Sequence, residues 1–306
     1  MKRGTVVSIG TFDGIHLGHQ AILRELRLQA KGHSLSSLVY AFSVPPRWAL
    51  RGDEEERYLL LTTALKVNLL DQSADLVHSS TFESVRSMDP EDFIETVLIN
   101  QLRARVVVEG ESFRFGRNRT GDLGALQSLG AKRGLEVISV PPVMVGDEAA
   151  SSTRIRNAIR TSDFQTARDC LGRSPILVGT VVRGDQLGRK MRVPTANLDI
   201  DPHVLLPNPG IFLVHALGQS IRASGLLYIG SRPTFEQSES RCEVHLLDFS
   251  DRQLYGEVME IHLLQRIRDD RSFPSLGALR SQIEADIETA RKLLPGFPLI
   301  EQRISS

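Results

Sequence analysis

The sequence predicts two domains: an α/β domain with a parallel sheet, followed by an antiparallel barrel or sandwich closed by one helix. Apolar strands alternate with amphipathic helices up to about residue 171, and short strands separated by Gly, Pro and Asp follow. A helical stripe of apolar residues comes last. A chain of 306 residues is long enough for two domains that each bury a core. We therefore expect one domain over residues 1–171 and another over residues 172–306.

Strands and helices alternate in the first half. Four runs rich in β-branched residues are predicted strands: Val6–Ile9, Leu38–Phe42, Arg105–Val108 and Glu136–Val140. A helix over His19–Ala30 follows the first strand. Asp89 and Pro90 predict another helix start, because a capping carboxylate and a proline at the first helical position favour one. Such alternation is typical of a parallel sheet covered on both faces, which binds ligands at the carboxyl ends of its strands.

The second half has a different pattern. Five short runs are predicted strands: Leu177–Val182, Ile211–Ala216, Leu226–Ile229, Glu243–Phe249 and Val258–Leu264. Turn residues separate them without intervening helices, which predicts an antiparallel barrel or sandwich. The closing helix, over Ser275–Leu294, carries apolar residues at helical spacing, and we expect it to pack across the strands.

Charge and cysteine content limit the class of protein. Lys plus Arg and Asp plus Glu both total 37, and this balance argues against a nucleic-acid-binding protein. No apolar run approaches the length that spans a bilayer, and residues 1–4 offer no signal-peptide core. Cys170 and Cys242 lie far apart and outside any CxxC pair, so we expect reduced thiols rather than a zinc site or a disulfide. We expect a cytoplasmic protein with small-molecule partners, no nucleic acid and no membrane.

A glycine- and histidine-containing segment lies where the first strand gives way to the first helix. Glycines there permit sharp turns, and the free N–H groups of the helix start form a phosphate seat. His16 and His19 are three residues apart, so they point the same way and could stabilise charge developing on a phosphoryl group. An isolated motif of this kind is incidental about as often as functional. Zinc binding is a further interpretation, but no third ligand lies nearby. The candidate nucleotide-binding residues here are Gly10, Phe12, Asp13, Gly14, His16 and His19.

A second candidate phosphate-binding segment covers residues 151–156. Ser151, Ser152 and Thr153 are either a helix cap or hydroxyl donors to a phosphate. Arg156 presents a planar fork suited to phosphate oxygens, whereas Arg154 lies on another face and is the weaker candidate.

These two segments, GTFDGIHLGHQ and SSTRIR, resemble the adenylyltransferase half of bacterial bifunctional riboflavin kinase/FAD synthetases, within the wider HxGH nucleotidyltransferase superfamily. The resemblance implies a Rossmann-like domain in which His16, His19 and Arg156 act on the phosphates of ATP. The FMN phosphate would attack the α-phosphorus, forming FAD and releasing pyrophosphate. The resemblance further implies flavin binding at Ser112 and Phe113. Two positions depart from the family pattern: residues 43–46 read Ser-Val-Pro-Pro where an acidic-Pro-His-Pro run is usual, and Ser112 replaces the usual Asn.

The second half contains its own candidate site. Gly179, Gly184 and Gly188 could let a loop fold over a triphosphate, although glycine turns are common in barrels. Thr195 and Asn197 are two apart on an extended segment and project to the same side. Their oxygens suit Mg²⁺, although such a segment is more often an ordinary turn. Glu243 could take a proton from a substrate hydroxyl, or it could simply be solvated.

These features together resemble the riboflavin kinase module. The segments that carry the resemblance are GTVVRGDQLGRKMRVPTANL, GIFLVHA, YIGSRPTF, EVHLLDF, LYGE and the closing helix. It implies a six-stranded barrel, with Mg²⁺ and ATP bound at Thr195 and Asn197. It also implies that Glu243 is the base that activates the riboflavin 5′-hydroxyl. Riboflavin and ATP would be substrates, FMN the product of one domain and substrate of the other, and FAD the final product.

The leading hypothesis is therefore an enzyme that makes FMN in its second domain and FAD in its first. One alternative is a riboflavin kinase whose first domain has lost or weakened FMN adenylylation, motivated by Ser43, Val44, Pro45 and Ser112. Another is a flavin-sensing protein without catalysis, which would need neither a base nor a phosphate clamp. Adenylylation of a pantetheine or nicotinate nucleotide fits the first domain and leaves the second unexplained.

Overall fold

The computed structural model describes residues 4–45, 58–184, 193–231, 240–249, 253–300 and 303–304. The chain divides into two compact units, residues 1–152 with 170–172 and residues 153–169 with 173–306. Residues 153–169 thus group with the second unit, and the boundary of the functional domains at residue 171 stays a prediction.

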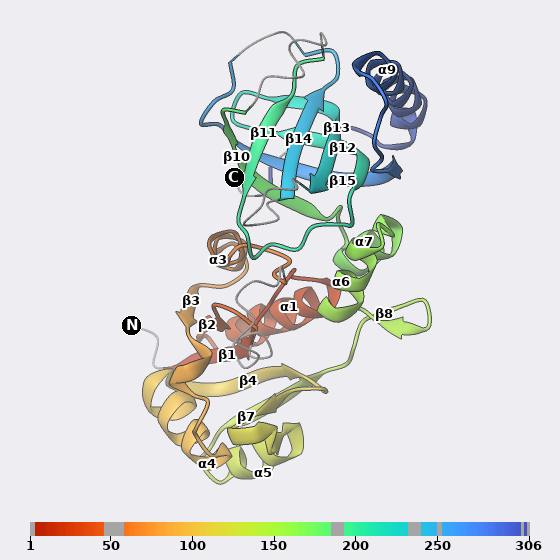
Figure 1. Cartoon of the computed structure of the whole chain (residues 1–306). Coiled ribbons are helices and arrows are strands. Elements are labelled where there is room, and N and C mark those ends of the chain that lie inside the picture. The colour runs from red at the N-terminus through yellow and green to blue at the C-terminus, as the bar shows by residue number, and fades with distance from the viewer. Residues whose placement is uncertain are drawn as a thin grey trace. The chain divides into compact units, whose positions relative to one another are not determined.

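The first unit is built on a five-stranded parallel sheet (Figure 1), in the order β3-β2-β1-β4-β7. Its strands are β1 (Thr5–Gly10), β2 (Ser36–Phe42), β3 (Leu76–Ser80), β4 (Ala104–Gly110) and β7 (Glu136–Val140). The four predicted strands and the parallel α/β architecture are confirmed. β3 escaped prediction because it lies at the sheet edge and its residues are at most half-buried, so its apolar signal is weak.

Helices cover both faces of this sheet. α1 (Leu17–Gly32) buries Leu23, Leu26 and Ala30. The core on the other face includes side chains of η2 (Phe93–Gln101, a π-helical stretch) and α5 (Leu123–Ala131). The remaining elements are α3 (Thr63–Asp71), η1 (Phe82–Ser84), α4 (Pro90–Asp92), β5 (Arg114–Phe115), η3 (Arg117–Arg119), β6 (Gly121–Asp122), β8 (Met144–Val145) and β9 (Glu148–Ala149).

Two local predictions at helix starts need correction. α1 begins at Leu17 rather than His19, because His16 has the extended backbone of an N-cap and passes directly into the helix. Asp89 is the residue before α4, as predicted, but its side chain makes no capping hydrogen bond. Its carboxylate instead lies 2.9 Å from a guanidinium nitrogen of Arg117.

The second unit contains a closed antiparallel barrel in the order β10-β11-β14-β13-β12-β15. Its strands are β10 (Ile176–Val182), β11 (Ala196–Ile200), β12 (Gly210–Leu217), β13 (Arg222–Ser231), β14 (Ser240–Leu246) and β15 (Val258–Asp269). The prediction of an antiparallel domain is confirmed, with a barrel rather than a sandwich. β14 stops at Leu246 and not at Phe249, since Asp248 has a φ of 54°, outside the strand region.

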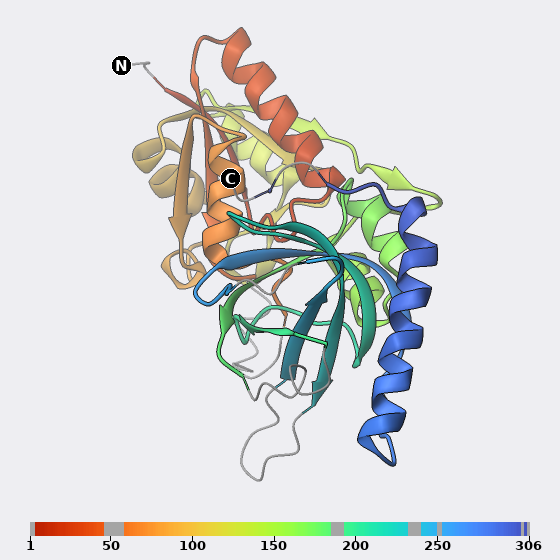
Figure 2. The same cartoon turned by 90° about the horizontal axis from the view of Figure 1, so that it is seen from above.

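Helices pack on the barrel. α9 (Leu276–Leu293) runs along its outside (Figure 2) and begins where the Ser275 hydroxyl accepts a hydrogen bond from the Ala278 amide at 3.1 Å. α6 (Ser152–Arg160) and α7 (Phe164–Leu171) precede the barrel, and η4 (Leu294–Gly296) follows α9. The rings of Phe164 and Phe212 lie 5.7 Å apart and join α7 to β12. Within the described parts of the chain, no helix is both long and apolar enough to cross a membrane.

Candidate active sites

The loop between β1 and α1 has a strained backbone. Phe12 and Ile15 have φ values of 51° and 44°, and Gly14 lies between them at 82°. A positive φ is an outlier for a β-branched residue such as Ile15, and it costs about 1–3 kcal/mol. The Gln20 side-chain amide donates to the Ile15 carbonyl at 3.0 Å, which helps to hold this conformation. Such strain is concentrated at functional sites.

Asp13 fixes this loop to its surroundings and is itself buried. Its carboxylate oxygens lie 3.1 and 3.3 Å from the Leu60 amide nitrogen, which donates to them. The Ser152 hydroxyl donates to the Asp13 carbonyl at 2.9 Å, so the second predicted phosphate-binding segment reaches this loop through Ser152. A Cβ atom added to Gly14 would lie 2.8 Å from the Leu60 side chain, so only glycine fits there.

His16 and His19 lie together at the start of α1. Their ring centroids are 3.8 Å apart and the rings are stacked. Phe12 lies on the adjoining loop, with 5.2 Å between its ring centroid and that of His19. Nδ1 of His19 is buried and makes no hydrogen bond within the described residues. The predicted common orientation of the two histidines is thus observed.

Charge around His19 is set by burial and by two neighbours. Desolvation, then the nearby His16 and Lys66, hold the pKa of His19 well below its usual 6.5, so the ring is neutral at neutral pH. A neutral imidazole keeps one N–H donor for a phosphate oxygen. Lys66 lies in α3 and was not among the predicted site residues.

Glu109 was also not predicted; it lies in β4, and its side chain contacts β1. β1 and β4 pair in parallel from Thr5 to Val7 of β1. Further along the strands, the Glu109 carboxylate accepts a hydrogen bond from the Ile9 amide at 2.5 Å. Burial raises the pKa of Glu109, so the group favours its neutral form. A side-chain carboxyl group thus accepts a main-chain amide between β1 and β4. The strand order reverses between these two strands, and ligands bind at such a reversal in parallel sheets.

For the other predicted residues of the first site, the structure gives their positions in the fold. Thr153 and Arg156 belong to the second compact unit, and Arg156 is buried. Ser112 is exposed on the turn after β4. Phe113 stacks on Phe115 with 5.6 Å between ring centroids. Their binding roles, and that of Ser151, stay predictions.

In the barrel, the predicted metal ligands and base come together. The Thr195 hydroxyl donates to a Glu243 carboxylate oxygen at 3.1 Å. Asn197 on β11 pairs in register with Glu243 on β14, so their side chains share one sheet face. The Arg241 guanidinium pairs with the other oxygen of Glu243. Thr195, Asn197 and Glu243 thus form one polar cluster.

Two of the three predicted loop glycines are described. A Cβ atom added to Gly184 would lie 2.2 Å from the Asn197 amide nitrogen, so glycine is needed for that side chain to occupy its place. Gly179 lies in β10, where an added Cβ would come 3.0 Å from the Asp199 carbonyl oxygen. Gly188 lies outside the described residues.

A cavity of about 310 Å³ opens beside the polar cluster. Thr195 and Glu243 line it at one end, and apolar side chains such as Leu226, Leu279 and Ile283 line much of the rest. An apolar cavity with a few converging polar groups is the usual form of a small-molecule site. The lining therefore suits a largely apolar ligand that carries a polar group near Thr195 and Glu243.

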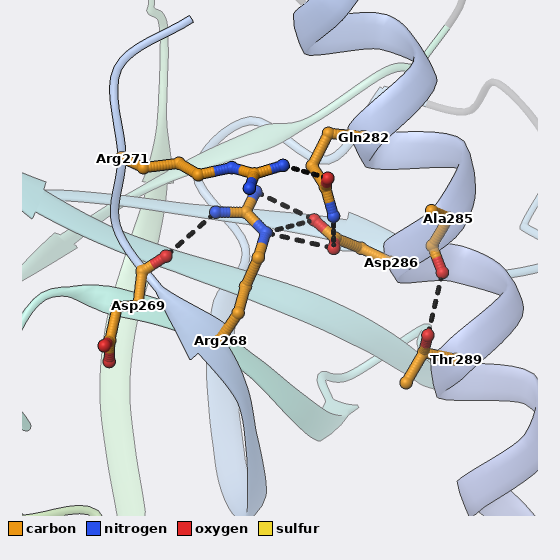
Figure 3. Close-up of polar contacts among 7 residues, drawn as sticks. All are labelled: Arg268, Asp269, Arg271, Gln282, Ala285, Asp286 and Thr289. Carbon is orange, nitrogen blue, oxygen red and sulfur yellow. Dashed lines mark hydrogen bonds and ion pairs between the residues drawn. The ribbon is translucent and has the colours of Figure 1, made fainter.

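An ion pair holds α9 against the wall of this cavity (Figure 3). Both Asp286 oxygens accept from Nε of Arg268, at 3.0 and 2.9 Å. Gln282 donates to the same carboxylate at 2.7 Å and is itself bonded to Arg271. The ring of Phe273 lies under Arg271, with 4.9 Å between the guanidinium carbon and the ring centroid. This network fixes the helix that carries Leu279 and Ile283.

The sequence contained a signal for Asp286 that the prediction did not use. Asp286 lies among the apolar residues Leu279, Ile283 and Ala290 at helical spacing, where a carboxylate is unusual unless it is paired. For Arg268, Arg271 and Phe273 there was no comparable signal, because the strand end and the loop after it bring them to the cavity.

The fold and the two clusters describe a two-unit chain: a parallel-sheet α/β unit with a histidine pair at a helix start, and an antiparallel barrel with a polar cluster beside a cavity. Family models match both parts. The model described as FAD synthetase matches residues 1–154, and the model described as riboflavin kinase matches residues 171–294. The chain belongs to the bifunctional riboflavin kinase/FMN adenylyltransferase family.

Curated relatives and a solved structure cover nearly the whole chain. The bifunctional riboflavin kinase/FMN adenylyltransferase of Haemophilus influenzae is 34% identical, with 94% of each chain covered. That of Escherichia coli K12 is 33% identical, with 95% of this chain and 93% of the relative covered. A crystal structure described as a macrolide-efflux protein from Streptococcus pneumoniae matches with a TM-score of 0.83 and 30% identity over 95% of both chains.

Proposed function

We propose that the protein converts riboflavin to FMN in its barrel unit and FMN to FAD in its α/β unit, using ATP in both steps. Two clusters on one chain support this: Glu243 with Thr195 and Asn197 beside an apolar cavity, and the stacked pair His16 and His19 at a helix start. The relatives named above carry both activities in their names.

In the kinase step, Glu243 is the general base for the riboflavin 5′-hydroxyl. Its carboxylate is held by the Thr195 hydroxyl and by Arg241, which aims it at the cavity. The oxygens of Thr195 and Asn197 suit Mg²⁺, which accepts hard oxygen ligands and keeps waters and nucleotide phosphates in its shell. Thr195 and Asn197 would hold such an ion, which would supply positive charge to the transferring phosphoryl group. The carboxylate takes the hydroxyl proton as the oxygen attacks the γ-phosphorus of ATP, and the bond from that phosphorus to the bridging oxygen breaks, releasing ADP.

In the adenylyl-transfer step, the α/β unit orients two phosphate groups. His16 and His19 donate hydrogen bonds to the ATP phosphates from a loop held by strain and by Asp13. The FMN phosphate attacks the α-phosphorus, and the bond to pyrophosphate breaks. Positioning and charge stabilisation carry this step, because no group on the enzyme needs to be covalently modified. Arg156 as a phosphate clamp, and Ser112 and Phe113 as flavin contacts, are proposed on the family resemblance alone.

A kinase with an inactive first unit is the competing proposal, motivated by Ser43, Val44, Pro45 and Ser112. Incubation of the purified protein with riboflavin, ATP and Mg²⁺, followed by chromatography of the flavins, separates the two. FMN followed by FAD is the expected result. FMN that accumulates without FAD would leave the kinase alone, and unchanged riboflavin would overturn the assignment of the barrel. A cytoplasmic location is proposed from the cysteine content, since the chain has two cysteines far apart in sequence and outside any CxxC pair.

A further inference from the structure

Lys66 is a buried lysine next to the first site. Its side chain is almost fully buried, which is unusual for a lysine. Nζ donates to the carbonyl oxygens of Phe42 and Ser43, at 2.6 and 2.9 Å, at the carboxyl end of β2. The Thr63 hydroxyl, one turn earlier in α3, donates to the same Ser43 carbonyl at 3.1 Å. The first turn of α3 thus binds the end of a strand that borders the site.

A neutral donor could make the same contacts without the cost of burying a charge, so the ammonium group calls for a further explanation. Burial lowers the pKa of Lys66 to about 8, and the Asp13 carboxylate opposes that effect. The group is therefore still charged at neutral pH. Its charge acts on His19, whose pKa Lys66 lowers together with burial and with His16.

The titratable groups that act on one another here come from three elements. Asp13 and His16 lie on the loop after β1, His19 lies on α1, and Lys66 lies on α3. The Asp13 carboxylate and the Lys66 ammonium group act on one another, His16 and Lys66 act on His19, and the carboxylate accepts the Leu60 amide. With His19 neutral, the Lys66 ammonium group balances the Asp13 carboxylate, so an arriving polyphosphate, the anion that the proposed reaction supplies, does not meet an uncompensated negative charge.

We propose that Lys66 is a positioning residue for adenylyl transfer: its ammonium group fixes the carboxyl end of β2 and supplies positive charge behind the phosphate seat of His16 and His19. This inference rests on the proposed function of the first unit. The phosphate oxygens contact the histidines, and Lys66 acts through them and through the main chain. Loss of its proton at alkaline pH therefore weakens ATP capture.

The test is the pH dependence of kcat/KM for ATP with FMN as the second substrate, so that the kinase is idle. This parameter reports the ionisation of the free enzyme. The full-length wild-type chain is expected to lose kcat/KM above about pH 8, where Lys66 loses its proton. In Lys66→Arg the guanidinium stays charged, so the fall should move to higher pH. Lys66→Met should reduce kcat/KM roughly tenfold or more and show no fall near pH 8.

Matched controls separate charge from structure. Thr63→Val removes a hydrogen bond to the same Ser43 carbonyl without removing a charge, and it should keep the wild-type pH profile. Lys132→Met removes an exposed lysine of the same unit and should change nothing. Circular dichroism confirms that each variant is folded.

Four outcomes decide the matter. A wild-type protein that forms no FAD overturns the proposed function of the first unit, and this inference with it. If FAD forms, Lys66 loses its assigned role when the wild-type profile is flat through pH 8. It also loses that role when Lys66→Arg keeps the wild-type profile, or when Lys66→Met stays within twofold of wild type. Should the Lys66 variants fail to fold, a wild-type profile that is flat through pH 8 still overturns the assigned role.

Discussion

The two sites of this chain are held in place by different means. In the barrel, Thr195, Asn197 and Glu243 come together through the strand register of β11 and β14. In the α/β unit, the histidine pair depends on a strained loop, with a buried cation on a separate helix. A site set by strand register tolerates changes around it, whereas a site that depends on strain is sensitive to every contact that holds the loop. Variants of the barrel site should therefore change FMN formation, and variants of the histidine site should change FAD formation.

The largest effect is expected from Glu243→Ala. Loss of a general base reduces the rate of FMN formation by about 10³-fold, since such groups contribute 10²–10⁴-fold. Conversion of FMN to FAD should be unchanged, because that step uses the other unit. Flavin chromatography with riboflavin or with FMN as substrate measures each step. His203→Ala removes a barrel-unit residue that does not line the cavity, and this control should retain kinase activity. Equal loss of both steps in Glu243→Ala would contradict separate sites.

The next largest effect concerns the helix at the barrel cavity. Asp286→Ala leaves Arg268 without its buried partner, and breaking such a pair costs about 3–5 kcal/mol. Urea unfolding of the full chain should show this loss in the transition of the barrel unit. Glu284→Ala breaks the exposed pair with Arg280 and should cost less than about 0.5 kcal/mol. A similar small cost for both variants would show that Arg268 and Asp286 do not hold the cavity wall.

His19→Ala tests the strained site. Removal of one preorganised donor to a transition-state charge lowers the rate of FAD formation about 10²-fold. FMN formation from riboflavin should stay at the wild-type rate. His33→Ala, at the exposed end of the same helix, removes a histidine away from the site. Should FAD formation survive in His19→Ala, the stacked pair has no catalytic role.

The smallest expected effect is a pH dependence of barrel stability. His215 is buried, with 3.1 Å from Nδ1 to the Ser224 hydroxyl and 3.2 Å from Nε2 to the Phe297 carbonyl. Burial lowers the pKa of His215 below its usual 6.5, so the folded unit favours the neutral ring. Its contribution to stability is complete above pH 6.5 and is lost as pH falls through the lower, folded-state pKa.

Unfolding measured between pH 7.5 and pH 5 tests this. The barrel transition of wild type should weaken toward pH 5, and that of His215→Gln should weaken less. An equal pH dependence in both proteins would assign the effect to other groups.

Much of the fold and of the two candidate sites could be predicted from the sequence. Strand alternation placed Thr195 and Asn197 on one side of an extended segment, and three-residue spacing placed His16 and His19 together, because both are local geometric rules. The contacts between elements could not be predicted in the same way; they involve Lys66, Glu109 and the pair of Arg268 with Asp286. The partners of these residues are distant in sequence, so only the packing of one helix or strand against another reveals which groups are paired.

The central claim is that one chain carries two independent active sites. The most direct test combines two variants, Glu243→Ala and His19→Ala, with riboflavin, ATP and Mg²⁺. The account predicts that Glu243→Ala alone leaves riboflavin unchanged, that His19→Ala alone accumulates FMN, and that a mixture of the two proteins forms FAD. A mixture that forms no FAD, although each variant is folded and wild type completes both steps, would contradict two separable sites.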